Sequence, residues 1–376
     1  MHSEGTAYAD TVGGSPVFSY KFGGFVQAAR DLSDKFRIVG SVRVDKARDI
    51  NQVFTERIGF IYAPNNRNNF RMSYQNGYRL PTFVEAYMYI KTDNGIGVGG
   101  LKQSLESFNI VHNSYSYESV LAFKAGYLHD VTSGSTSAQA LTNNASLLKV
   151  STFDYLKPEQ NQTIDFSYKG SFLNDKLYVD ANVYGTQYNN FIQTFTVIKP
   201  TGGISTAITT DATKILSSKY SVYQTLSNVT SNVYVYGASI SVDYEFYKQY
   251  MISGNFNYIE MNWGNTSKEA LSNGFNTPKY SMNLSISNPN VYKNLGFKVT
   301  YKWTDKTDWK TDFSVGTVPS WQTVDAQCSY RMPEMKATLA LGGTNLLNKY
   351  YTQYIGGSSI GGFYYGSITF DGLLTK

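Results

Sequence analysis

Apolar and polar side chains alternate with a period of two in segment after segment between Arg37 and Phe370. In residues 295–303 every odd position carries a large apolar or aromatic side chain, and every even position carries glycine, threonine or lysine. Residues 280–286 and 164–168 show the same alternation. Successive side chains of a β-strand point to opposite faces of the sheet, so each segment is predicted to be a strand between an apolar and a polar medium.

About thirteen strands follow from this alternation, and the connections between them fall into two classes that alternate along the chain. Tight turns are predicted at residues 32–35, 64–67, 172–175, 247–249, 288–294 and 332–335. The opposite connections are mostly long, at residues 80–159, 196–228, 264–278, 304–319 and 348–360, with the short segment 47–51 as the exception. An antiparallel meander with short turns at one end and long loops at the other predicts an all-β transmembrane barrel in a bacterial outer membrane, with its short turns in the periplasm.

The composition agrees with this fold class. Charged residues make up 16% of the chain, against roughly 25% in ordinary soluble domains, whereas tyrosine (32) and phenylalanine (22) are frequent. Aromatic rings suit the two membrane interfaces. No run of about 18 apolar residues occurs, which excludes a transmembrane helix. The net charge of +5 comes without basic runs, so nucleic acid is not an expected partner.

The charged side chains test the predicted strand faces, because a lysine or arginine that faces lipid at mid-bilayer costs roughly 2–4 kcal/mol. The charged residues of the clearest strands fall on the polar face, as a water-filled or plugged lumen would require: Arg71, Asp165, Lys169, Asp180, Asp243, Glu245, Lys298, Lys302 and Asp325. Cys328, the single cysteine, falls on the apolar face. We interpret it as a small lipid-facing residue that forms no internal disulfide.

The predicted strand directions indicate part of a larger barrel. If the last strand, residues 362–370, runs toward the periplasm, then the first, near residues 17–30, runs the same way. Bacterial single-chain barrels have an even number of strands and keep both termini in the periplasm. Residues 1–10 also lack the basic and apolar regions of a signal peptide. We therefore expect residues 1–376 to be the C-terminal part of a longer barrel.

Three motifs resemble those of TonB-dependent outer-membrane receptors. Residues 77–85 read Gly-Tyr-Arg-Leu-Pro-Thr-Phe-Val-Glu, open the longest loop, and resemble the family's Gly-Tyr-Arg-x-Pro-x-Phe-x-Glu stretch. Residues 156–159, Leu-Lys-Pro-Glu, resemble its Leu-x-Pro-Glu segment. Residues 345–351, Asn-Leu-Leu-Asn-Lys-Tyr-Tyr, together with the aromatic-rich strand that follows, look like its last hairpin.

This resemblance implies a barrel of about 22 strands whose lumen is filled by an N-terminal plug. Uptake would be driven by the TonB complex acting on that plug. Residues 1–376 would then be a partial receptor β-barrel domain that lacks the plug and the first strands. The implied partners are outer-membrane lipid, the TonB complex, the barrel-assembly machinery and a small-molecule or oligosaccharide ligand. The tyrosine- and asparagine-rich loops, and the tail after Phe370, resemble receptors of the Bacteroidetes.

The candidate ligand-binding residues are aromatic side chains in the long loops. The connection 80–159 is far longer than an ordinary loop, so a functional or disordered segment is expected. Rings in this and two further loops present amphipathic surfaces suited to flat organic ligands or sugar rings: Tyr87, Tyr89, Tyr115, Tyr117, Trp309 and Tyr354. The alternative is that these rings pack the loops onto their neighbours.

The remaining motifs are not assigned to a ligand or a metal. The glycine-rich residues 95–100 lack the β-α context of a phosphate-binding loop and are expected to be a flexible hinge. His112 and His129 share the long loop, but two histidines without cysteine or well-spaced carboxylates are a poor metal site. No nucleophile, base and acid can be recognised at fixed spacing, so no catalytic residue, metal or cofactor is predicted.

Three functions remain for such a barrel. The first is active import of a scarce nutrient, such as a ferric siderophore, haem, cobalamin or an oligosaccharide. The second is a passive porin, which the three motifs and the strand count of the implied barrel disfavour. The third is an outer-membrane enzyme, which would need serine and histidine facing lipid near one rim. No predicted strand carries a histidine.

Overall fold

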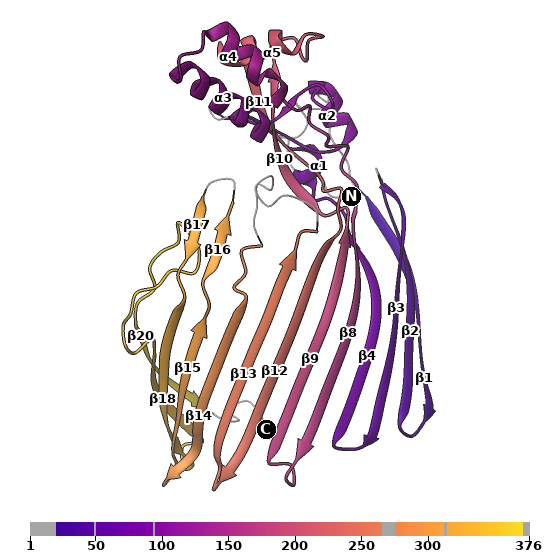
Figure 1. Ribbon diagram of the computed structural model, residues 1–376. Helices are drawn as coiled ribbons and strands as arrows, with labels where there is room; N and C mark the ends of the chain where they lie inside the picture. Colours follow the sequence, from indigo (N-terminus) through magenta and orange to yellow (C-terminus); the bar gives the residue numbers. More distant parts are fainter. Residues whose placement is uncertain (1–19, 49, 93–94, 265–274, 312–313, 371–376) are drawn as a thin grey trace.

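The computed structural model describes residues 20–48, 50–92, 95–264, 275–311 and 314–370. These residues form a tall curved β-sheet and a smaller body of helices and short strands above one end of it (Figure 1). We call the smaller body the head; it comprises residues 83–153 and 192–228. Within the described ranges, no helix is both long and apolar enough to cross a membrane.

The tall sheet contains thirteen described strands, each antiparallel to its neighbours, in the order β1-β2-β3-β4-β8-β9-β12-β13-β14-β15-β18-β19-β20. Their bounds are β1 (Lys21–Ser33), β2 (Phe36–Ala47), β3 (Ile50–Asn65), β4 (Asn68–Arg79), β8 (Glu159–Phe172), β9 (Leu177–Asn189), β12 (Val233–Tyr247), β13 (Tyr250–Asn262), β14 (Tyr280–Tyr292), β15 (Leu295–Thr304), β18 (Trp321–Met332), β19 (Ala337–Thr344) and β20 (Phe363–Phe370). This order confirms the predicted meander. The first strand extends to Ser33 rather than residue 30, and residues 17–19 of its prediction lie outside the described residues.

Tight turns join the strands at the end of the sheet away from the head, as predicted (Figure 1). Non-glycine residues with positive φ occur in several of them, including Asn174 (55°), Gln249 (67°) and Asn294 (69°). Left-handed backbone at these positions closes a hairpin in keeping with the twist of its strands. The predicted turn at residues 288–294 is shorter than expected, because β14 continues to Tyr292.

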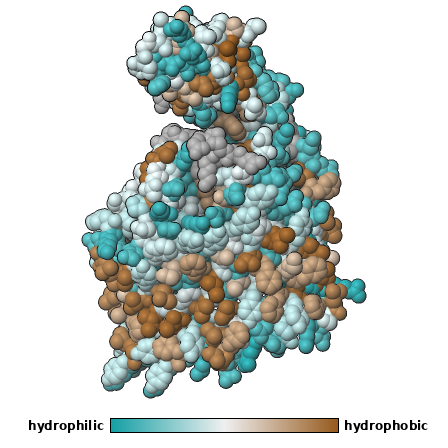
Figure 2. All heavy atoms as spheres, in the orientation of Figure 1, coloured by the Kyte–Doolittle hydropathy of each residue, from teal (hydrophilic) through white to brown (hydrophobic). Residues whose placement is uncertain are grey.

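One face of the sheet is apolar although it is exposed. A single row of Cα partners across β3, β4, β8 and β9 contains Phe60, Met72, Phe166 and Val183. All four side chains are exposed. Such a continuous apolar surface is expected of a sheet that meets lipid. We call this the outer face, and Figure 2 shows it as a brown belt across the lower part of the sheet.

The opposite, inner face is polar, and two of its lysines form ion pairs with aspartates. Lys169 Nζ lies 2.9 Å from Asp180 Oδ2, and Lys302 Nζ lies 2.7 Å from Asp325 Oδ2. The register places all four on the face opposite the apolar rows, as predicted. Cys328 instead pairs with Phe297 and Leu341 on the outer face, and this also agrees with the sequence.

The apolar belt has a distinct boundary at each end. Toward the head, the row formed by Asn76, Gln162 and Gln187 replaces apolar side chains with amides. Toward the turns, aromatic rings follow one another at centroid separations of 4.6, 6.1 and 4.7 Å in the row Phe36, Tyr62, Phe70 and Tyr168. A belt edged by aromatic and polar side chains is typical of strands that cross a bilayer.

The two longest connections are folded into the head. The first contributes α1 (Phe83–Tyr87), β5 (Tyr89–Thr92), β6 (Gly95–Val98), α2 (Lys102–Phe108), β7 (Tyr115–Ser116), α3 (Tyr117–Thr132), α4 (Ser137–Asn144) and the 3-10 turn η2 (Ala145–Leu147). The second contributes β10 (Ile192–Pro200), α5 (Ile208–Leu216) and β11 (Tyr220–Asn228). Five of these strands form a second sheet in the order β5-β6-β11-β10-β7. The prediction of a loop over residues 196–228 is therefore wrong in detail, because the strands β10 and β11 occupy its two ends.

The connection between β15 and β18 is also partly ordered as a hairpin. It contains β16 (Thr307–Lys310) and β17 (Val315–Val318), which pair antiparallel. Most of the predicted loop at residues 264–278 lies outside the described residues.

The two faces of β13 provide a matched test of the membrane assignment. Phe256 lies on the outer face between Ile240 and Met282, and its neighbour Asn257 lies on the inner face between two serines. Phe256→Arg should lower the free energy of unfolding in phospholipid vesicles by roughly 2–4 kcal/mol, because the charge meets hydrocarbon. Asn257→Arg should change it little. Denaturant titration of the intact protein gives both values, and equal effects of the two substitutions would contradict the assignment of faces.

Candidate functional site

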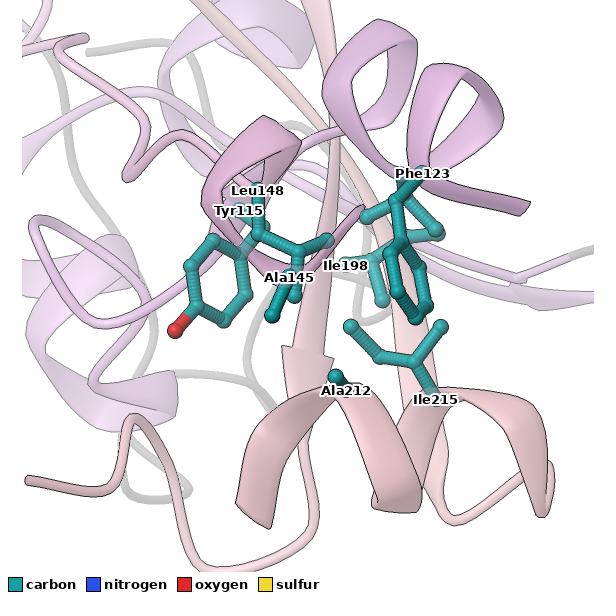
Figure 3. Close-up of a cluster of buried hydrophobic side chains, with 8 residues drawn as sticks. Tyr115, Phe123, Ala145, Leu148, Ile198, Ala212 and Ile215 are labelled. Atoms are coloured by element: carbon teal, nitrogen blue, oxygen red, sulfur yellow. The ribbon is translucent and has the colours of Figure 1, made fainter. Parts of the chain in front are cut away.

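A hydrophobic core joins the two connections of the head into one body. Its buried members come from β7, α3 and the η2 region of the first connection and from β10 and α5 of the second: Tyr115, Val120, Phe123, Ala145, Leu148, Ile198, Ala212 and Ile215. In Figure 3, Phe123 of α3 points toward Ile215 of α5. Full burial of a large apolar side chain contributes about 1.5–3 kcal/mol. Neither connection can bury these residues without the other.

Backbone pairing joins the same two connections. β6 pairs in parallel with β11, and β7 pairs antiparallel with β10. A second buried cluster packs against this sheet and again draws on both connections: Val98, Leu105, Ile110, Phe153, Val197 and Tyr223. The head is therefore a rigid, folded platform above the sheet rather than a pair of separate loops.

A buried carboxylate stabilises the head between α5 and β7. Asp211 accepts hydrogen bonds from the Tyr115 hydroxyl at 2.9 Å and the Ser205 backbone N–H at 2.8 Å, and the Lys214 ammonium lies 3.3 Å away. Burial opposes ionisation of Asp211, but these donors outweigh it and lower the pKa of its carboxyl below the ordinary value. Burial and the bond to Asp211 raise the pKa of Tyr115.

The predicted ligand-binding tyrosines divide into interior and surface positions. Tyr115 and Tyr87 are only 2% and 6% exposed, so their rings pack inside the head. Tyr89 and Tyr117 are 39% and 38% exposed. Tyr89 is also held in place by Phe108, whose ring centroid lies 5.6 Å away. The packing alternative thus describes Tyr115 and Tyr87, and ligand contact stays a prediction for the two exposed rings.

The glycine-rich segment is not the flexible hinge that the sequence suggested. Gly95–Val98 is strand β6, and Gly99 and Gly100 follow it in close contact with other backbone. Their N–H groups donate to the carbonyl oxygens of Met88 and Glu85 at 2.7 and 2.8 Å. A β-carbon would collide with a carbonyl oxygen at either glycine. The glycines are needed for close packing, a requirement that periodicity cannot reveal.

Two predicted residues from separate connections meet beyond β15 and β18. Trp309 on β16 and Tyr354 have ring centroids 5.9 Å apart. Gly316 is the partner of Trp309 in the hairpin, and a β-carbon there would touch Ile355 at 3.5 Å. The hairpin β16–β17 therefore packs on the segment before β20. Tyr354 is half exposed, so this ring pair is a second accessible aromatic surface.

The described residues contain no group of three or more histidine, cysteine, aspartate or glutamate side chains placed to hold a metal ion.

Comparison with known proteins identifies the fold. The model of the TonB-dependent receptor-like β-barrel family matches residues 4–346. The chain belongs to this family. Its members are outer-membrane nutrient receptors. The comparison with curated proteins gave no match. An origin in the Bacteroidetes stays a prediction.

Solved structures of TonB-dependent receptors resemble the chain in fold. The siderophore receptor PirA from Acinetobacter baumannii is 13% identical, with a TM-score of 0.59, over 93% of this chain and 45% of its own. The ferric enterobactin receptor PfeA from Pseudomonas aeruginosa, as a mutant, is 14% identical, with a TM-score of 0.60, over 93% and 44%. The copper transporter OprC is 12% identical, with a TM-score of 0.58, over 93% and 47%. The chain spans less than half the length of these proteins.

The receptor motif at residues 77–85 forms the junction between the sheet and the head. Arg79, at the end of β4, donates to both carboxylate oxygens of Glu85 in α1, at 2.8 and 2.9 Å. Its guanidinium also lies 3.5 Å from Glu159, the first residue of β8. Glu159 accepts the N–H of Ile192 at 3.1 Å, and Thr82 and Glu85 cap α1 reciprocally. The motif residues thus connect β4, α1, β8 and β10.

Replacing the buried carboxylate tests whether it stabilises the head. Asp211→Asn removes the charge that pairs with Lys214 and should destabilise the head by about 1–3 kcal/mol. Hydrogen exchange of the α5 amides measures this loss in the intact receptor. Asp130→Asn is the control: among the described residues this carboxylate of α3 accepts from the side chains of Asn143 and Asn144, and an amide oxygen can replace it.

The same residue predicts a pH dependence. The pKa of Asp211 is lowered in the folded head, so its stabilisation is present above the ordinary value of 3.8 and is lost as the pH falls below it toward the folded pKa. As the pH is lowered, the hydrogen-exchange protection of the α5 amides should therefore fall more steeply in the native receptor than in the Asp211→Asn variant. Parallel pH profiles would contradict the role of this carboxylate.

Proposed function

We propose that this chain is the barrel part of an energy-coupled importer in the bacterial outer membrane. The observation that carries the proposal is the combination of an apolar outer face, a polar inner face with paired charges, and a folded head above the end opposite the tight turns (Figure 1). A polar inner face suits a hydrated plug, and a structured head suits the capture of a ligand before it enters the barrel. Energy for uptake would come from the TonB complex acting through the plug.

The aromatic surfaces support a small organic or sugar-containing ligand. Tyr89 and Tyr117 on the head and the pair Trp309 and Tyr354 beyond β15 offer partly exposed ring faces on one end of the molecule. Such rings bind flat or ring-shaped ligands through large contact areas at low cost in side-chain entropy. A ferric siderophore, haem, cobalamin or an oligosaccharide would each fit this chemistry. Relatives of similar fold include siderophore receptors and a copper transporter.

Removing the exposed rings tests the binding surface. The double variants Tyr89→Ala with Tyr117→Ala, and Trp309→Ala with Tyr354→Ala, should each weaken ligand binding to whole cells roughly tenfold, since an aromatic contact contributes about 0.5–1.5 kcal/mol. Tyr178→Ala is the control, because this exposed tyrosine lies on β9 near the tight turns. Equal affinity in all variants would refute the assignment of the surface.

Energy coupling separates the importer from a passive porin. Growth on the limiting nutrient should stop in cells without TonB while ligand binding at the surface persists. Uptake that continues without TonB would favour the porin, whatever the aromatic variants do.

A further inference from the structure

Helix α3 of the head is apolar on two sides, but only one of them is buried. Val120 and Phe123 are fully buried in the core that joins the two connections. Leu121, Leu128 and Val131 are 49%, 61% and 36% exposed. A helix turns by about 100° per residue, so these three exposed residues share one side of α3, roughly a quarter of a turn from the buried side. Figure 1 shows α3 along the left margin of the head.

The exposed residues follow the spacing of a helix-packing seam. Leu121, Lys124, Leu128 and Val131 are three, four and three positions apart, and we call these four residues the α3 stripe. One helix packs along another with this spacing. Tyr117, four positions before Leu121, continues it to the start of α3. An isolated exposed leucine is ordinary, whereas a helix that is apolar on more than one side is normally covered on each of them.

Lys124 adds a positive charge to the middle of the α3 stripe. Its ammonium donates to the Tyr220 hydroxyl at 3.1 Å and lies 4.9 Å from the centre of that ring. A hydroxyl is neutral, and the ammonium forms no ion pair with a residue that the structure describes. The chemistry of the stripe therefore suits a helix that presents apolar side chains with a carboxylate opposite Lys124.

The same lysine argues against a second copy of this chain as the occupant. From Tyr117 to Val131, Lys124 is the central position. When two copies of a helix pack across a two-fold axis, the residue at the centre lies opposite itself. Two ammonium groups would then meet within an otherwise apolar seam, where their charges are costly to desolvate.

The construction of the head favours a further segment of the same receptor. Its core already forms between two connections, and neither buries its apolar residues alone. The α3 stripe borders this interface, because Lys124 reaches Tyr220 at the start of β11. The solved receptors of similar fold are more than twice as long as the part of them that this chain matches. Receptors of that length have room for further connections above the barrel.

We propose that the α3 stripe is the docking surface for an amphipathic helix from another extracellular connection of the same receptor, outside residues 1–376. The helix packs along α3 with apolar side chains against Leu121, Leu128 and Val131 and with a carboxylate opposite Lys124. It covers the turns from Leu121 to Val131, so Tyr117 lies at its end and stays open to a ligand. The inference rests on packing and charge, and it holds whichever nutrient is imported.

Cysteine labelling of the complete receptor tests the proposal. In a Cys328→Ser background, Leu121→Cys places a thiol on the stripe, and Ala122→Cys places one at the adjacent exposed position outside it. A membrane-impermeant maleimide should label Leu121→Cys at least about tenfold more slowly than Ala122→Cys, because only molecules with the helix undocked react. Mass spectrometry of the α3 peptide gives both rates. The difference should be the same on whole cells and in the purified receptor.

Reversing the charge of the stripe tests the carboxylate. Lys124→Glu in the Leu121→Cys protein should raise the labelling rate toward that of Ala122→Cys, because two carboxylates then face each other. Lys124→Arg is the matched control, since it keeps the charge and should leave labelling slow. Hydrogen exchange of the α5 amides must be the same in all variants, so that fast labelling reports undocking rather than an unfolded head.

The other occupants give different results. Equal labelling of Leu121→Cys and Ala122→Cys in a folded head would overturn the docking surface. Slow labelling of Leu121→Cys on cells but fast labelling in the purified receptor would overturn the helix of the same receptor in favour of a separate partner. A disulfide-linked dimer of a Lys124→Cys variant after mild oxidation would overturn it in favour of a second copy.

Discussion

Backbone N–H and C=O groups cannot remain unpaired in hydrocarbon, and the architecture of this chain depends on that constraint. Each strand between the two edge strands of the tall sheet is hydrogen-bonded on both sides, so its polar backbone is satisfied within the sheet, whereas β1 and β20 are each paired on one side in this sheet. Once the backbone is paired, side chains alone decide which face meets lipid. The apolar rows on the outer face and the paired charges on the inner face follow from this division.

The same constraint explains why the sheet could be predicted from the sequence. Strands between lipid and water need alternating side chains, and the order of strands in a meander follows the order of the chain. In residues 295–303 the odd positions carry the apolar and aromatic side chains that β15 places on the outer face, and this series ends at Trp303. The face assignments and the strand order therefore needed no information beyond the period of two and the position of turns.

The head could not be predicted in this way, because its contacts join residues that are far apart in the chain. Tyr115 resembles a ligand-binding ring in the sequence, but its hydroxyl bonds Asp211 on another connection. Gly99 and Gly100 resemble a hinge, although neighbouring carbonyl groups pack against them. Trp309 and Tyr354 are separate candidates in the sequence, and nothing there indicates that they meet.

The parallel pairing of β6 with β11 has a consequence for how receptors of this kind diversify. The two connections that build the head are separated in the chain by the hairpin of β8 and β9. If one connection alone were exchanged for another sequence, the connection that remained would lose its partners. Its buried side chains would lack the residues they pack against in the hydrophobic core, and its strands would lack the strands they pair with in the second sheet. Inheritance of a working head therefore requires residues 80–228 to pass as one block, with two membrane strands carried along between its halves.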